Sequence, residues 1–327
     1  MRKNVHIVAQ GKGGVGKTFI CWLAAQYLRE THGEEAVSFA DSDPVNKSFA
    51  AFRGLDAISL DLFSEDHRNV EPGDFEKVFE FIQASRRPDI LIDTGASNFL
   101  PLYTFLSADQ ADQMLADTQC NLILHVPVCG GESRTECLQR LQIMLDNIPN
   151  ARFVVWINNY PAEVFPKNKT EDPSSREPEK FEETGYFQKY KDRIEGIVNL
   201  PHFPDDSTGK TLKLLTKSLL TFSEFDKLGG GASIPKLQGV AITYLQKFRA
   251  KQVKQRLWNL MKPLFGHLDK FKDDSMSFAV IDHGSSDEGG VYVPGSAAPA
   301  QEGDGFDEAA AEELYDDDND LGGGEEE

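Results

Sequence analysis

The chain has 327 residues, of which 40% are hydrophobic and 27% are charged. This composition excludes collagen-like, wholly disordered and disulfide-scaffold proteins, and the length suits one large domain or two small ones. Four cysteines without a C-x-x-C pair, and a start without a signal-peptide pattern, favour a reduced cytoplasmic location. No apolar run is long enough to span a bilayer, so we expect a soluble or at most peripheral protein.

The net charge of -19 is concentrated at one end of the chain. Residues 283–327 contain fifteen acidic residues and neither lysine nor arginine, so residues 1–282 carry a net charge of only -4. The acidic segment has too few apolar residues to offset the entropy of ordering it. We therefore predict a disordered acidic tail over 283–327, preceded by a linker over 266–282.

Short apolar runs of strand length recur along the first two hundred residues, with helical stretches between them. They cover residues 5–9, 36–40, 90–92, 122–126, 153–157 and 194–200. Runs that are apolar on both faces are typical of parallel strands covered by helices. The pattern predicts an α/β domain over residues 1–265, with three layers and a mostly parallel twisted sheet. Ligands bind beyond the carboxyl ends of such strands.

Two later stretches depart from this alternation. Residues 161–185 are rich in Lys, Glu, Asp, Pro and Ser, which indicates a solvated, mobile insertion. Residues 210–228 and 234–262 have helical periodicity. The second stretch would place a set of apolar side chains on one face at a spacing of about four residues: Leu237, Ala241, Leu245 and Phe248.

The second of these stretches predicts a basic C-terminal helix over 235–262. Between positions 247 and 262 it contains no acid and six cations: Lys247, Arg249, Lys251, Lys254, Arg256 and Lys262. A basic amphipathic helix binds DNA phosphates, an anionic membrane surface or a partner's groove. The alternative is a helix whose apolar side packs on the domain while its lysines face water. The sequence leaves both interpretations open.

Residues 11–18, GKGGVGKT, match the phosphate-loop pattern G-x-x-x-x-G-K-[ST], which here follows a predicted strand and opens a predicted helix over 17–30. Lys17 would reach the β- and γ-phosphates of a nucleotide, and the Thr18 hydroxyl would bind Mg²⁺. The helix would add its N-terminal dipole. Backbone N–H groups that converge on phosphate oxygens would come from Gly11, Gly13, Gly14, Val15 and Gly16.

Three acidic residues follow predicted strands. Asp93 has the position of the carboxylate that holds Mg²⁺ opposite a phosphate loop. Asp41 and Asp43 are two residues apart, so an extended chain would place both on one face. One could lie in the metal shell while the other orients a water. A turn built on Asp-Ser-Asp-Pro is the alternative, and the neighbouring phosphate loop favours the functional interpretation.

Five sequence blocks together resemble the ParA and MinD superfamily of ATPases, whose phosphate loop has the extra lysine of K-G-G-x-G-K-[ST]. Within that superfamily they are similar to the ParA-like proteins of bacterial conjugative plasmids. The likeness covers roughly residues 3–265, is weak in 161–185 and is absent from the acidic tail. The blocks are QGKGGVGK at 10–17, DSDPVN at 41–46, IDTGASNFLPL at 92–102, GG at 130–131 and FVVWIN at 153–158.

The resemblance implies a role for each matching charged residue. Lys12 would reach across a nucleotide-sandwich dimer to the partner subunit's phosphates, where it would act with Lys17 in catalysis. Asp43 would position the attacking water. Asp41 and Asp93 would lie in the shell of the Mg²⁺ ion.

The resemblance also implies where the base would bind. Asn158 would read the adenine edge, and Pro201 would pack against the base. The chain departs from the family at two places: Val45 stands where many ParA proteins have Gln, and residues 94–95 are Thr-Gly in place of Cys/Thr-Pro. Both departures lie beside the predicted catalytic aspartates.

As a whole the resemblance implies a slow ATPase that uses ATP and Mg²⁺ to dimerise during conjugative plasmid DNA transfer. Such a protein would be cytoplasmic, or peripheral at the inner membrane, with a relaxase, a coupling protein or other conjugation machinery as partners. Its basic segment, 247–262, would contact nonspecific DNA or an anionic membrane. Two alternatives stay open: a partition ATPase that binds DNA nonspecifically, and a non-hydrolysing adaptor that recruits transfer machinery.

Overall fold

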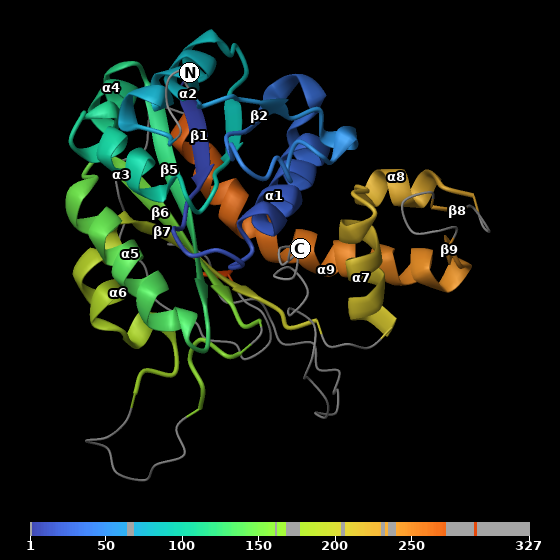
Figure 1. Ribbon diagram of the computed structural model, residues 1–327. Coiled ribbons are helices and arrows are strands. Elements are labelled where there is room, and N and C mark those ends of the chain that lie inside the picture. Colours follow the sequence, from blue (N-terminus) through green and yellow to red (C-terminus); the bar gives the residue numbers. More distant parts are fainter. Residues whose placement is uncertain are drawn as a thin grey trace, which may run out of the picture.

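The computed structural model describes residues 2–63, 69–160, 162–167, 177–203, 207–229, 233–234, 240–272 and 291–292. A twisted sheet lies at its centre, with helices on both faces (Figure 1). The strand order is β10-β7-β6-β5-β1-β4-β2-β3. All neighbouring pairs are parallel except β10 with β7. The predicted three-layer α/β fold is confirmed.

Six strands correspond to the predicted apolar runs: β1 (Lys3–Val8), β2 (Val37–Asp41), β4 (Asp89–Asp93), β5 (Cys120–Cys129), β6 (Ala151–Asn158) and β7 (Ile194–Leu200). Two short edge strands are additional, β3 (Ile58–Ser59) and β10 (Val291–Tyr292). Within the predicted acidic tail the structure describes β10 alone, whose two strand-forming residues pair with the edge of β7. The rest of 283–327 lies outside the described residues.

The sheet divides the core into two clusters of buried side chains. On β4, Ile90 and Ile92 contribute to one cluster and Leu91 to the other, because successive strand residues point to opposite faces. The first cluster is covered by α2 (Glu76–Ala84), α3 (Phe99–Ser107), α4 (Ala111–Asp117), α5 (Ser133–Asn147) and α6 (Gly185–Tyr190). The second is covered by α1 (Lys17–His32), α7 (Ser207–Lys217), α8 (Phe222–Lys227) and α9 (Tyr244–Leu268).

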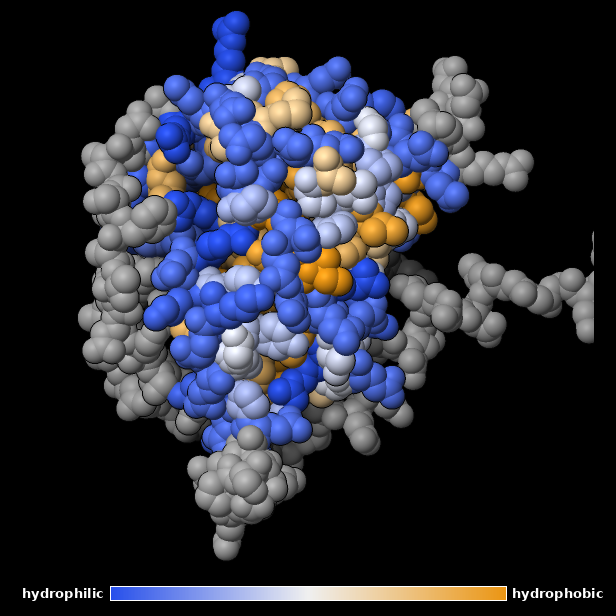
Figure 2. All heavy atoms as spheres, turned by 90° about the vertical axis from the view of Figure 1, so that its left-hand side faces the viewer, coloured by the Kyte–Doolittle hydropathy of each residue, from blue (hydrophilic) through white to orange (hydrophobic). Residues whose placement is uncertain are grey.

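The outer surface over α3, α5 and α6 is mostly hydrophilic, with small apolar areas (Figure 2). Their buried residues face the sheet instead, as expected of helices that cover one side of a core. Among the residues that the structure describes, no helix is both long enough and apolar enough to cross a bilayer.

The C-terminal helix differs from the prediction of a helix over 235–262. Residues Val240–Ala241 form β9, which pairs with β8 (Ser233–Ile234). The helix α9 begins only at Tyr244, because the Thr243 side chain caps it by accepting a hydrogen bond from the Gln246 backbone at 3.1 Å. It continues to Leu268 and into a 3₁₀ turn at Asp269–Lys272. Residues 266–272, predicted as linker, are therefore helical.

The predicted apolar face of this helix is also wrong. Leu245 and Phe248 are 59% and 53% exposed. Because α9 reaches the core only after its first turn, its buried residues lie further along: Ala250, Val253, Leu257, Met261, Leu264, Phe265 and Leu268. Of the other residues predicted for that face, Leu237 lies outside the described residues, and Ala241 is in β9.

The predicted insertion over 161–185 is only partly a solvated segment. Val164 and Phe181 are buried in the core cluster beneath α5. A Cβ at Gly130 would lie 2.1 Å from the carbonyl oxygen of Ala162, so only glycine admits the backbone of the insertion here. Pro161 and residues 168–176 lie outside the described residues.

A cluster of ion pairs joins the amino end of the sheet to the C-terminus of α9. Asp89 at the start of β4 accepts hydrogen bonds from His32 Nδ1 at 2.9 Å and Lys272 Nζ at 2.7 Å. Asp269 accepts from His32 Nε2 at 3.0 Å and from Lys272 at 2.8 Å. His32, Asp89 and Asp269 have the spacing of metal ligands, but the Lys272 ammonium and the His32 ring, whose pKa these carboxylates raise to about 9, together balance both carboxylates.

His125 on β5 is buried in the core with both ring nitrogens in hydrogen bonds, as its position in an apolar run predicts. Its ring is fully buried, accepts a hydrogen bond from Trp156 Nε1 at 3.0 Å and lies 2.9 Å from His6 Nδ1. Burial lowers the pKa of His125 well below its usual value. The ring is therefore neutral and joins neighbouring strands instead of acting as a base.

Candidate nucleotide site

The phosphate loop lies between β1 and α1, at the carboxyl edge of the sheet. Gly14 and Gly16 have φ angles of 72° and 90°, which only glycine adopts without strain. Lys17 is 8% exposed, and its Nζ donates to the carbonyl oxygen of Lys12 at 3.1 Å. Burial lowers the pKa of Lys17, while Asp93 and Asp43 oppose that effect. The loop and helix start that the sequence predicts are both present.

Strand register brings the predicted metal-binding residues to this loop. Asp93 at the end of β4 pairs with Val8 on one side and Asp41 on the other. The Thr18 hydroxyl donates to Asp93 Oδ2 at 2.7 Å. Burial and, to a smaller extent, the nearby Asp41 carboxylate raise the pKa of Asp93 to about 7. A buried acid with so little compensating charge favours a cation.

The Asp-Ser-Asp-Pro segment forms the turn that the sequence offered as an alternative, and it lies at the loop as well. Asp41 accepts hydrogen bonds from the backbone N–H groups of Asp43 at 3.0 Å and Ala50 at 2.9 Å. Asp43 Oδ1 accepts from the N–H groups of Val45 at 2.9 Å and Asn46 at 3.0 Å. The two aspartates therefore fix the turn and also place their charge near Lys17 and Asp93.

Gly95, one of the departures from the family, makes room for Asp43. A Cβ at position 95 would lie 2.8 Å from the Asp43 carboxyl group. Asn98 Nδ2 donates to the carbonyl oxygen of Ser42 at 2.9 Å and joins the same two segments. Sequence reasoning missed Asn98 as a positioning residue, although it lies inside one of the matching blocks.

The residues at this edge fit a magnesium ion. Thr18, Asp41 and Asp93 offer hydroxyl and carboxylate oxygens, which are the ligands that Mg²⁺ prefers. Asp93 and Thr18 already share one hydrogen bond.

The predicted base-binding residues lie at the ends of the next two strands. Asn158 ends β6, and its Nδ2 donates to the carbonyl oxygen of Val15 at 3.2 Å. Its side chain is therefore anchored on the phosphate loop. Pro201 directly follows β7, the neighbouring strand. Close by, the rings of Tyr160 and His202 stack with their centroids 6.2 Å apart.

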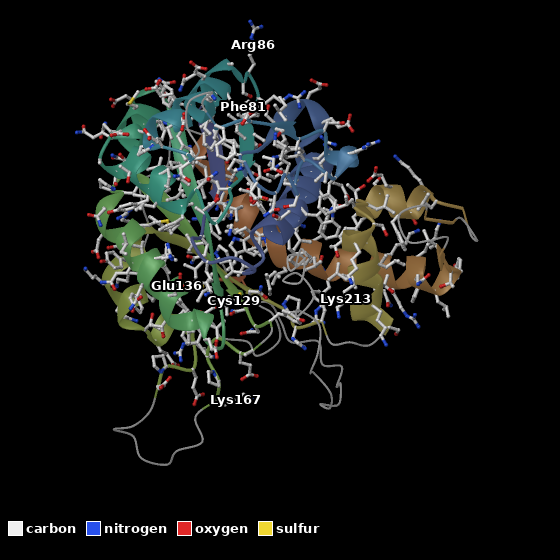
Figure 3. All side chains as sticks on the ribbon, in the orientation of Figure 1. Phe81, Arg86, Cys129, Glu136, Lys167 and Lys213 are labelled. Atoms are coloured by element: carbon white, nitrogen blue, oxygen red, sulfur yellow. The ribbon has the colours of Figure 1, made fainter. Side chains whose placement is uncertain are left out.

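A cluster that sequence reasoning missed lies on the other side of the loop. In Figure 3, Cys129 marks the carboxyl end of β5, and Glu136 lies on α5 beyond it. Lys12 Nζ lies 3.2 Å from Glu136 Oε2, and Arg140 Nη2 donates to Glu136 Oε1 at 2.8 Å. These bonds lower the pKa of Glu136. The helical spacing of Glu136 and Arg140 was the available signal.

The basic segment of α9 is less cationic than its sequence indicates. Lys251 pairs with Asp226 at 3.1 Å, Lys247 donates to the backbone of Asp226 at 2.8 Å, and Lys254 pairs with Glu30. Within the described ranges, only the remaining three cations lack such a partner: Arg249, Arg256 and Lys262. Ion pairs within the domain thus balance two of the six cations, Lys251 and Lys254.

The glycine loop, its two lysines and the three aspartates at one sheet edge define a P-loop NTPase fold with the ParA/MinD type of loop. No family model matches the chain. Two curated proteins named TraL from Escherichia coli are similar to it: one is 29% identical over 78% of this chain and 95% of its own length, and the other is 30% identical over 68% and 86%. The chain belongs to the TraL family.

Among solved structures, the MinD cell division protein of Aquifex aeolicus aligns with 77% of this chain and 97% of its own, at 15% identity. The TM-score is 0.39, which is too low to bear on the site.

Proposed function

We propose that the protein is an ATP-binding, slowly hydrolysing dimerisation switch. The observation that carries this proposal is that one phosphate loop brings together Lys12 and Lys17, joined by a hydrogen bond, and Thr18, which donates to Asp93. The first pair supplies cations for phosphate oxygens, and the second supplies oxygen ligands for a metal. A triphosphate with Mg²⁺ needs both.

Two residues of the loop region would take part in phosphoryl transfer to water. Lys17 would hold the β- and γ-phosphates, and Asp43, fixed by its turn over Gly95, would orient the attacking water. When bound, Mg²⁺ neutralises charge on the phosphate oxygens. Little covalent chemistry is asked of the protein, so positioning would determine the rate.

The surroundings of Lys12 support dimerisation. Its side chain is 41% exposed and its only ionic contact within the described residues is the exposed Glu136, an arrangement that leaves the ammonium accessible to a second copy. Two apolar side chains beside the predicted catalytic segments are also exposed, Val45 by 68% and Leu100 by 66%. Apolar side chains exposed beside such a site are suited to burial against a partner.

Light scattering after size-exclusion chromatography, combined with phosphate release, tests the switch. We expect the wild type to be a monomer without nucleotide or with ADP, and a dimer with ATP and Mg²⁺. Asp43→Ala should remain a dimer with ATP, and Lys12→Ala should not hydrolyse it. Lys210→Ala, an exposed lysine on α7, is the control. A mass that does not respond to nucleotide, or full hydrolysis by Lys12→Ala, would overturn the sandwich-dimer mechanism.

We place this switch in conjugative DNA transfer. Membership in the TraL family and the five blocks shared with ParA-like proteins of conjugative plasmids support this process. Such a switch would work in the cytoplasm or at the inner membrane and would recruit a relaxase or coupling protein. Pull-down of purified relaxase or coupling protein by the ATP-bound form, and not by the ADP-bound form, is the expected result. Equal capture in both states would argue against nucleotide-controlled recruitment.

Nonspecific DNA binding, as in a partition ATPase, is the second candidate. The observation that favours it is the set of three cations on α9 without a partner among the described residues, Arg249, Arg256 and Lys262. ATP-dependent DNA retention that weakens with salt and is lost in the variant Arg256→Gln/Lys262→Gln would support it. Retention that these changes do not affect would exclude this surface.

A further inference from the structure

Arg140 forms part of the wall of the phosphate loop. A Cβ at Gly11 would lie 2.1 Å from Arg140 Nη1 and 2.6 Å from its Cζ, so the guanidinium occupies the space that any other residue at position 11 would need. The same group stacks over the Phe99 ring, 4.9 Å from its centroid. Phe99 begins α3, directly after the segment that carries Asp93. The side chain is thus held between the loop and the predicted catalytic segment.

Glu136 fixes the direction in which this guanidinium points. Arg140 Nε and Nη2 both donate to Glu136 Oε1, at 3.2 and 2.8 Å. Nη1, the nitrogen against Gly11, has no acceptor within hydrogen-bond distance in the part of the chain that the structure describes. Two N–H groups on a charged nitrogen therefore remain available beside the loop.

Charge divides the site into two halves. Lys12, Arg140 and Glu136 share hydrogen bonds or ion pairs and carry a combined charge of about +1, to which Lys17 adds another. Asp93 and its acidic neighbours lie on the metal-binding side. Because Lys12 and Arg140 share one carboxylate, they lie at the same end of the loop. By the family resemblance, Lys12 reaches from here to the partner subunit's phosphates, whereas Arg140, packed against Gly11, stays at its own loop and would meet the nucleotide that this loop holds.

We propose that Arg140 is a phosphate-binding residue that acts within its own subunit, that Glu136 positions it, and that it favours a triphosphate over a diphosphate. This inference rests on the proposed nucleotide-binding function. An arginine binds phosphate oxygens through charged N–H groups in a fixed geometry. The terminal phosphate would therefore be bound by an arginine of the same subunit as well as by the lysine of a second copy.

Equilibrium binding of fluorescent ATP and ADP analogues, with Mg²⁺, tests the proposal. Arg140→Gln should weaken binding of the ATP analogue about tenfold more than binding of the ADP analogue, and Arg140→Lys should restore part of the difference. The matched control is Arg134→Gln on the same helix. Arg134 also pairs with a glutamate, Glu177 at 2.9 Å, and stacks on a phenylalanine, Phe165 at 5.1 Å, but it does so at the insertion.

The outcomes separate this inference from the proposed function. A wild type that binds neither analogue would overturn both. If the wild type binds both analogues and Arg140→Gln binds them with the same ratio of affinities as the wild type, only the role of Arg140 is overturned. Unchanged affinities would mean that Arg140 does not contact the nucleotide, and equal weakening of both would mean that it only shapes the loop. Thermal unfolding of Arg140→Gln and Arg140→Lys identifies any loss that arises from misfolding.

Discussion

Two aspartates at opposite ends of one strand show how charge separates a structural site from a binding site. Asp89 begins β4 and Asp93 ends it, and both side chains are nearly fully buried. Burial would raise the pKa of Asp89, but the hydrogen bond from His32, the His6 ring 3.9 Å away and the charge of Lys272 hold it well below its usual value. For Asp93 burial prevails, and its pKa rises to about 7.

The difference lies in the neighbours. At the amino end, two carboxylates meet a lysine and a histidine, whose pKa their hydrogen bonds raise to about 9. The charges there balance without a ligand. At the carboxyl end, Asp93 accepts a hydrogen bond from the Thr18 hydroxyl and shares the positive charge of Lys17 with Asp43. The nearby Asp41 carboxylate adds a further negative charge. An imbalance of this kind marks a site that is completed by binding.

The same substitution should cost much more stability at the amino end of β4 than at its carboxyl end. We expect Asp89→Asn to lower the free energy of unfolding by about 3 kcal/mol, because it leaves buried cations without their partner. Asp93→Asn should change it by less than about 1 kcal/mol, because relief of charge repulsion offsets the weakened bond from Thr18. Urea denaturation of both variants measures the two values. Similar losses at both ends would break the comparison.

Removal of a cation at the nucleotide end should affect binding more than folding. Lys17→Ala should weaken ATP affinity by about 10- to 100-fold, because a charged hydrogen bond to phosphate contributes roughly 1.5–3 kcal/mol. Isothermal titration with ATP and Mg²⁺ measures it, with Lys210→Ala as the exposed control. An affinity in Lys17→Ala equal to that of the control would mean that the loop does not hold the phosphates as proposed.

High pH should weaken the amino-end cluster. His32 has a folded pKa of about 9, above the unfolded value near 6.5, so its charged form stabilises the fold. That contribution is fully present below pH 6.5 and is lost as pH rises through 9. Between pH 6 and pH 10 the wild type should lose about 1 kcal/mol more unfolding free energy than His32→Gln, a modest effect because water partly screens His32, which is 19% exposed, and Asp269, which is 35% exposed. Parallel losses in the two proteins would exclude this role.

The sequence predicts the fold and the nucleotide site where the signal is local. The apolar runs identify six strands, and the spacing of glycines and lysine identifies the loop, because each depends on neighbouring residues. The Arg140 cluster was missed because only the folded chain brings α5 against Gly11. The apolar face of α9 was misassigned because the cap at Thr243 and the position of the sheet decide which turns are buried.

The ion-pair cluster at the amino end was missed for a similar reason. Its members are separated by up to 240 residues in the sequence. Only the folded chain brings them together at the amino end of the sheet, where their charges balance. At the carboxyl end the aspartates follow strands directly, and their position relative to the loop could be anticipated from the order of the strands.

Salt should distinguish the two ends by a smaller effect. Dissolved ions screen accessible charges far more than buried pairs. We therefore expect that raising NaCl from about 0.05 to 0.5 M weakens ATP affinity about threefold in the wild type and less in Lys17→Ala, which lacks one of the screened charges. The stability difference between the wild type and Asp89→Asn should stay within about 0.5 kcal/mol over the same range, since Asp89 is only 1% exposed in its pair with Lys272. The contrary outcome is a loss of unfolding free energy in Asp89→Asn that shrinks with salt as strongly as the ATP affinity. Water and ions would then reach the amino end as readily as the nucleotide end. The contrast between a closed ion cluster and an open binding site would fail.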